Sequence, residues 1–81
     1  MTKSNEETVA LFELRKRLEE NNIFNFIFLL YRDSSDGRYF FEIYDKGREN
    51  LLFSAKGKDR CESIKAVLIK VKEKFYGDEG I

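Results

Sequence analysis

The side chains best suited to chemistry form a short basic cluster. Lys56, Lys58 and Arg60 follow one another at alternate positions, and Lys65 comes one to two helical turns later. The pattern after them is helical, so the cluster lies at the N-terminus of an expected helix. A helix N-terminus offers free amide groups and the positive end of the helix dipole, which together attract anions. Lys56, Lys58, Arg60 and Lys65 are therefore the candidate nucleic-acid-binding residues.

Other chemistry is not indicated. The sequence has no histidine, which is the usual general base and the commonest metal ligand. It also lacks the common phosphate-loop, zinc-protease and nucleophile-elbow motifs. Cys61 is the single cysteine and falls on an apolar helical stripe, which favours a small core residue over a reactive thiol. We expect no catalytic residue, metal, cofactor or small-molecule substrate, and no enzyme.

Composition indicates a globular protein of neutral charge. The chain has 81 residues, with 15 basic and 15 acidic side chains and a formal net charge of zero. We expect one domain over residues 1–81, with frayed ends at 1–4 and 78–81. The N-terminal residues contain no apolar signal segment, and the longest apolar run is far shorter than a membrane span. These features predict a soluble, cytoplasmic protein without a membrane partner.

Two amphipathic helices are expected at the ends of the chain. The first spans about residues 5–20, starts at a capping box formed by Ser4 and Glu7, and ends at Asn21-Asn22. Its predicted apolar face comprises Leu11, Leu14 and Leu18, widened by Val9 and Phe12. The second helix follows a capping box of Asp59 and Glu62 and ends near Gly77. Its apolar stripe is Cys61, Ile64, Val67, Leu68, Val71 and Phe75.

The segment between the helices carries nine of the twelve aromatic residues and predicts three strands, at 24–31, 38–44 and 51–56. Short polar turns, each with a glycine, join the strands and favour an antiparallel meander. The fold class is therefore α+β, in the order α-β-β-β-α. The predicted inward residues are Phe24, Phe26, Phe28, Leu30, Tyr39, Phe41, Ile43, Leu51, Phe53 and Ala55.

Strand alternation also predicts an outer face that is unusually apolar. Its apolar members are Ile27, Leu29, Tyr31, Phe40, Tyr44 and Leu52. If both helices pack on the inner face, these residues form an interface for a homodimer or a protein partner. Three alternatives stay open: the helices cover opposite faces, the outer aromatics simply lie flat and partly exposed, or they stack on the bases of a single-stranded nucleic acid. Ile69 and Tyr76 lie off the apolar stripe of the second helix. They could form a secondary contact with a partner or be scattered surface residues.

With these elements the chain resembles the double-stranded RNA-binding domain. That family has the same element order in about the same length, and its second helix starts after a glycine with lysines that hold phosphates. Gly57, Arg60 and Ser63 match the family glycine, its first helix lysine and a small position, whereas Cys61 and Ile64 replace two lysines. The turn at 33–37 also lacks the family's Gly-Pro and histidine. The resemblance implies the fold over residues 6–76, and double-stranded RNA binding as the alternative function.

Two looser likenesses complete the range of hypotheses. The segment Phe41-Glu-Ile-Tyr44, Ser54 and the spacing of Ile64 and Val67 are similar to small YegP-like β-β-β-α domains. Small histidine-poor α/β proteins are also common among phage-encoded inhibitors of bacterial defence proteins. That class remains a further alternative on size and composition alone.

Overall fold

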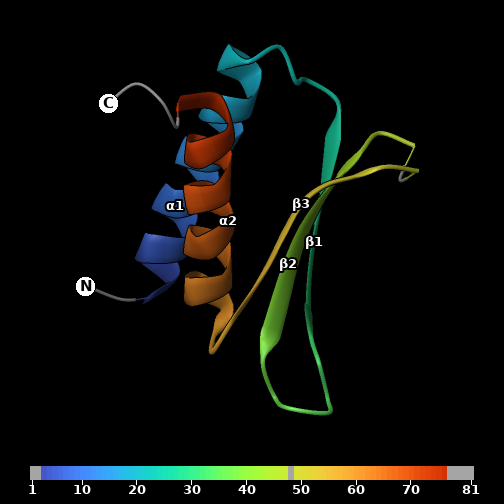
Figure 1. Ribbon diagram of the computed structural model, residues 1–81. Coiled ribbons are helices and arrows are strands. Elements are labelled where there is room, and N and C mark those ends of the chain that lie inside the picture. Colours follow the sequence, from blue (N-terminus) through green and yellow to red (C-terminus); the bar gives the residue numbers. More distant parts are fainter. Residues whose placement is uncertain (1–2, 48, 77–81) are drawn as a thin grey trace.

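A computed structural model describes residues 3–47 and 49–76 (Figure 1). Along the sequence, one helix precedes three consecutive strands and a second helix follows them. They are α1 at Lys3–Glu20, β1 at Phe26–Arg32, β2 at Tyr39–Asp45, β3 at Leu51–Gly57 and α2 at Arg60–Tyr76. The α+β class and the order α-β-β-β-α are thereby confirmed.

The strands form one antiparallel sheet in the order β1-β2-β3. Leu29 lies opposite Glu42, and Glu42 lies opposite Ser54, which fixes the register across the sheet. The turn between β1 and β2 uses Gly37 at a φ of 75°, a left-handed conformation that glycine adopts without strain. Asn22 has a φ of 67° after α1, so it ends that helix as predicted.

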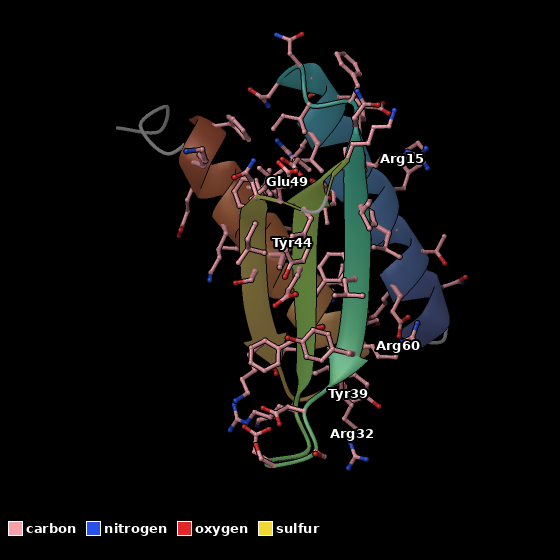
Figure 2. The ribbon with its side chains drawn as sticks, turned by 90° about the vertical axis from the view of Figure 1, so that its right-hand side faces the viewer. Arg15, Arg32, Tyr39, Tyr44, Glu49 and Arg60 are labelled. Carbon is pink, nitrogen blue, oxygen red and sulfur yellow. The ribbon has the colours of Figure 1, made fainter. Side chains whose placement is uncertain are left out.

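Both helices lie on one face of the sheet, as the edge-on view in Figure 1 shows. Helix α2 packs against β2 and β3, whereas α1 packs mainly against α2. Viewed from the side of the strands, the sheet lies in front of both helices (Figure 2). The alternative with one helix on each face is therefore excluded.

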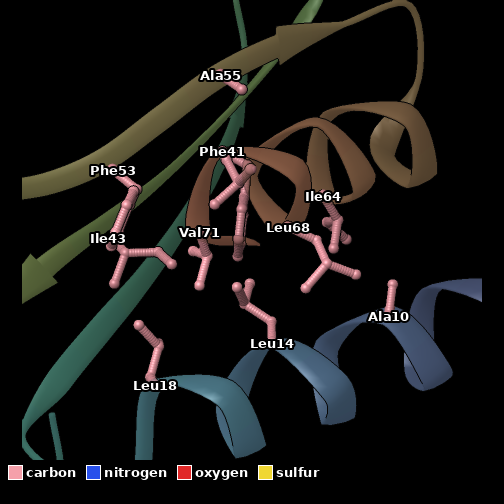
Figure 3. Close-up of a cluster of buried hydrophobic side chains, with 11 residues drawn as sticks. Ala10, Leu14, Leu18, Phe41, Ile43, Phe53, Ala55, Ile64, Leu68 and Val71 are labelled. Atoms are coloured by element: carbon pink, nitrogen blue, oxygen red, sulfur yellow. The ribbon is translucent and has the colours of Figure 1, made fainter. Parts of the chain in front are cut away.

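The core fills the space between the helices and the inner face (Figure 3). Phe41 and Ile43 of β2 are 2% and 0% exposed, and Leu14 of α1 is 0% exposed. The remaining buried hydrophobic residues of the core cluster are Ala10, Leu18, Phe53, Ala55, Ile64, Val67, Leu68 and Val71. The predicted stripe of α2 is confirmed, with Cys61 also buried and Phe75 packed against the cluster.

Gly57 joins β3 to α2 at very close range. A Cβ at this position would overlap the backbone nitrogen of Ser63 and would lie 2.8 Å from the carbonyl carbon of Glu62. The glycine matched to the resembled family thus has a steric role here. At the start of α2, Asp59 Oδ1 accepts a hydrogen bond of 2.8 Å from the Glu62 amide. This part of the predicted capping box is confirmed.

Several local predictions were wrong. Helix α1 begins at Lys3, so the backbone of Ser4 lies inside the helix instead of before it, and the Ser4 side chain lies outside the described residues. Strand β1 begins at Phe26, which leaves Phe24 outside the strand and 63% exposed. Val9 and Phe12 do not widen the apolar face of α1, because they are 65% and 69% exposed. The expected fraying at 78–81 and the cap at Gly77 lie outside the described residues.

The remaining correction concerns the start of β3. A register shift between Ile43 and Tyr44 places Leu51 opposite Tyr44 and Phe53 opposite Ile43. Leu51 is consequently 51% exposed instead of inward, while Leu52 is half-buried and packs against the core. A bulge of this kind moves the alternation by one residue, so Leu51 takes the outer position that was predicted for Leu52.

Candidate functional site

The outer face of the sheet is the first candidate site, and its residues form a regular array. Each strand contributes three positions that lie side by side in the pairing register. The array comprises Ile27, Leu29 and Tyr31 of β1, Phe40, Glu42 and Tyr44 of β2, and Leu51, Ser54 and Lys56 of β3. We call these residues the outer array. Five of the six residues predicted for the interface belong to it, and Leu52 does not.

Glu42 occupies the centre of the outer array. The hydroxyl of Tyr44 donates to Glu42 Oε1 at 2.8 Å, and the hydroxyl of Tyr31 donates to Oε2 at 3.1 Å. The pKa of Tyr31 is raised above its usual value of 10.0, first by desolvation and then by its hydrogen bond to Glu42. Two tyrosines thus fix the two oxygens of the central carboxylate. Figure 2 shows Tyr44 on the sheet face turned toward the viewer.

One end of the outer array is an aromatic stack with a paired cation. The rings of Tyr31 and Phe40 have centroids 5.4 Å apart and planes 20° apart. Lys56 Nζ lies 5.0 Å from the centre of the Phe40 ring and forms an ion pair with Asp36. The hydrogen bond from Lys56 is the first cause of a lowered pKa at Asp36. The charge of Lys56 is therefore compensated by the turn between β1 and β2.

Glu42 lacks such compensation within the part of the chain that the structure describes. Over residues 3–47 and 49–76, no cationic side chain forms an ion pair with it. Among the described residues, the outer array therefore presents at its centre one negative charge that no cationic side chain pairs with, and mostly apolar side chains lie around it.

The predicted basic cluster is dispersed by ion pairs. Lys56 points onto the outer array, while Arg60 binds Glu7 of α1 at 3.3 Å. Lys65 binds Glu6 of α1 at 3.2 Å, and this hydrogen bond raises the pKa of Lys65. The backbone amide of Lys58 donates to Glu62. Three of the four predicted cations thus carry an acidic partner, and they do not converge on one surface.

Cys61 is buried beside these ion pairs. Its thiol is 3.6 Å from Glu6 Oε1, and desolvation is the first cause of its raised pKa. A buried thiol with a raised pKa has little thiolate and low reactivity. This geometry agrees with its interpretation as a core residue.

A second apolar surface is the groove between α1 and α2, with a volume of about 650 Å³. Ala10 and Leu68 line it together with Val9 and Ile69, which is 55% exposed. Ion pairs border it, from Lys65 to Glu6 and from Lys72 to Glu13 at 3.5 Å. The helical pattern placed Ile69 off the apolar stripe of α2, as observed, but it assigned Val9 to the apolar face of α1. The side chain of Tyr76 lies outside the described residues.

These features also limit the chemistry that the described part of the chain offers. It contains no group of three or more histidine, cysteine, aspartate or glutamate side chains placed to hold a metal ion. Within the same residues, neither helix is both long enough and apolar enough to cross a bilayer.

Comparison with known proteins gave no match: no protein family, no curated protein and no solved structure is similar to this chain at a significant level. The resemblance to the double-stranded RNA-binding domain therefore rests on the shared α-β-β-β-α topology and its three-stranded antiparallel sheet.

Proposed function

We propose that this chain is a protein-interaction domain that binds a partner protein on the outer array. The observation that carries the proposal is the uncovered apolar face of the sheet, which remains because both helices pack on the other face. Aromatic side chains in a flat, rigid array are typical anchors of protein interfaces. Their backbones are held in a paired sheet, so little ordering is needed on binding.

A different protein fits the outer array better than a second copy does. In a two-fold dimer that superposes two complete faces, the central residue of one face meets its own copy. Glu42 would then lie against Glu42 of the other chain, and two carboxylates brought together out of water repel each other. A partner with a different surface avoids this repulsion.

The proposal is tested with two variants that place the same charge on different surfaces. Phe40→Glu disrupts the outer array, and Phe12→Glu is its matched control, because Phe12 is 69% exposed on α1. Proteins captured from a cell extract by the wild-type domain are identified, purified and titrated against each variant by calorimetry. We expect Phe40→Glu to abolish binding of the purified partner and Phe12→Glu to preserve it.

Two results would contradict the proposal. One is a purified partner that binds Phe40→Glu as tightly as it binds the wild type. The other is a thermal unfolding temperature for Phe40→Glu far below that of Phe12→Glu, which would make the outer array part of the stable core. Sedimentation measures self-association separately, and we expect the free domain to be a monomer.

Nucleic-acid binding is the second candidate function. It is favoured by the position of Lys58 and Arg60 at the N-terminus of α2 and by the topology shared with double-stranded RNA-binding domains. The ion pairs of Lys56, Arg60 and Lys65 weaken this candidate, because each pair must open before phosphate is bound. A gel-shift titration with duplex RNA at low salt tests it. Binding that falls steeply with salt and is lost in Lys58→Ala/Arg60→Ala would support this function.

A further inference from the structure

We propose that Glu42 is the receptor for an arginine on the partner protein, set among apolar residues of the partner surface. This inference rests on the proposed function and names the chemistry of the partner. It follows from the negative charge of Glu42, which no cation in the described part of the chain pairs with.

Any partner that covers the outer array must satisfy Glu42. The carboxylate is central, so Leu29 and Ser54 flank it on the neighbouring strands and docking would remove it from water. Burial of an ionised carboxylate without a compensating charge is costly, whereas a paired and hydrogen-bonded one is tolerated. The other charge of the array, on Lys56, is already matched by Asp36. A docked partner must therefore supply a cation that pairs with Glu42.

The hydrogen bonds of Glu42 leave room for that cation. An ionised carboxylate has about four acceptor positions, and the two tyrosine hydroxyls use one on each oxygen. Both oxygens keep an acceptor position, and the tyrosines fix the plane of the carboxylate in advance. The parallel N–H groups of a guanidinium match two such oxygens at once, which a lysine ammonium does not.

The aromatic neighbours also suit an arginine. Tyr31 and Tyr44 flank the carboxylate, and Phe40 stacks on Tyr31. A guanidinium stacks on aromatic faces and is more weakly hydrated than an ammonium, so it is transferred from water more easily. The groove between α1 and α2 makes no such demand, because Lys65 and Lys72 already pair with its carboxylates.

A phage-displayed library of random peptides tests the inference without knowledge of the natural partner. Peptides are selected on the wild-type domain, and the Phe40→Glu variant is used to remove those that bind elsewhere. We expect the enriched peptides to contain an arginine beside apolar residues. For one synthesised peptide, Glu42→Gln should weaken binding by about tenfold or more, because the charged pair is lost.

Two controls isolate the charge. The side-chain amide introduced by Glu42→Gln can still hydrogen-bond both tyrosine hydroxyls, so we expect the thermal unfolding temperature of this variant to match that of the wild type. Glu73→Gln removes an exposed carboxylate from α2 and should leave peptide affinity unchanged. Replacing the peptide arginine by citrulline should reproduce the loss in the wild type and cause little further loss in Glu42→Gln.

The outcomes separate this inference from the proposed function. Peptides that require Phe40 but lack a cation, or that bind Glu42→Gln as well as the wild type, would overturn the arginine receptor and leave the outer array as a docking face. A library that yields no binder dependent on Phe40 would overturn both.

Discussion

The two faces of the sheet are built from the same three strands but have different surroundings. Phe40 and Phe41 are adjacent in β2, yet Phe41 is 2% exposed under the helices and Phe40 is half-buried on the open side. The next pair of residues in β2 differs in the same way: Ile43 is 0% exposed in the core, whereas Glu42 accepts hydrogen bonds from two tyrosine hydroxyls on the open side. The inner face supplies packing, while the outer face offers rings and a charge. Under the proposed function, stability and binding are therefore divided between alternate residues of β2.

The most severe test of this division exchanges the two neighbouring phenylalanines for alanine. Phe41→Ala removes a ring from the core and should lower the free energy of unfolding by about 3–5 kcal/mol. Phe40→Ala loses mainly its contacts with Tyr31 and Lys56, so about 0.5–1.5 kcal/mol is expected. Urea denaturation of both variants measures the difference. Equal losses of unfolding free energy in the two variants would show that the outer face contributes to stability as much as the inner face does.

A smaller loss of stability is expected for a substitution at Gly57, where β3 ends next to the first turn of α2. Gly57→Ala forces a Cβ against the first turn of α2, so the strand and helix must separate. We expect a loss of about 1–3 kcal/mol, as for other overpacked sites. Gly47→Ala is the control, because the nearest described atoms to its Cβ would be ordinary contacts with Glu49 at 3.7 Å and Asp45 at 4.0 Å. A Gly57→Ala variant as stable as Gly47→Ala would contradict the close approach.

Periodic sequence patterns predicted most of the framework. The alternation in β2 placed Phe41 and Ile43 in the core correctly, and the spacing in α2 did so for Ile64, Leu68 and Val71, because neighbouring elements cover these positions. Tyr39 was also predicted to point inward, but it is only half-buried at the start of β2. The prediction failed for Val9 and Phe12, since α1 presents only a narrow stripe to the rest of the fold. The helical spacing of apolar residues shows which side of a helix faces the core, but it does not show how many residues on that side a neighbouring element will cover.

The site was less accessible from sequence. Alternation identified the apolar members of the outer array, but the bulge at Tyr44 exchanged the roles of Leu51 and Leu52. No local pattern announces such a shift, because it depends on how β3 pairs. The hydrogen bonds from Tyr31 and Tyr44 to Glu42 depend on the pairing register of β1 and β2, so the sequence alone does not single out Glu42.

The third prediction concerns Lys56, the paired cation on the outer face, whose loss should lower stability less than Gly57→Ala does. Lys56→Gln removes the ion pair with Asp36 and the contact with Phe40, and we expect a loss of stability below that of Gly57→Ala. The pKa of Asp36 is lowered from 3.8, so the contribution of the pair is present above that pH. It is lost as the pH falls through the lowered value. The difference in stability between the two proteins, measured by denaturation, should therefore be smaller at acidic than at neutral pH, with the contact to Phe40 as the remainder. A difference that does not change with pH would contradict this.

The smallest expected effect concerns a proton and leaves stability nearly unchanged. Desolvation, and then the hydrogen bond to Glu42, raise the pKa of Tyr31 above the usual 10.0, so Glu42→Gln should lower this pKa while leaving the effect of desolvation in place. The sign is fixed by charge: a carboxylate disfavours the tyrosinate, whereas a neutral amide does not. Nuclear magnetic resonance of ring-labelled tyrosines follows Tyr31 separately from the other three. An unchanged Tyr31 pKa in Glu42→Gln would mean that the central carboxylate is not held between the tyrosines, and the outer face would then be merely apolar.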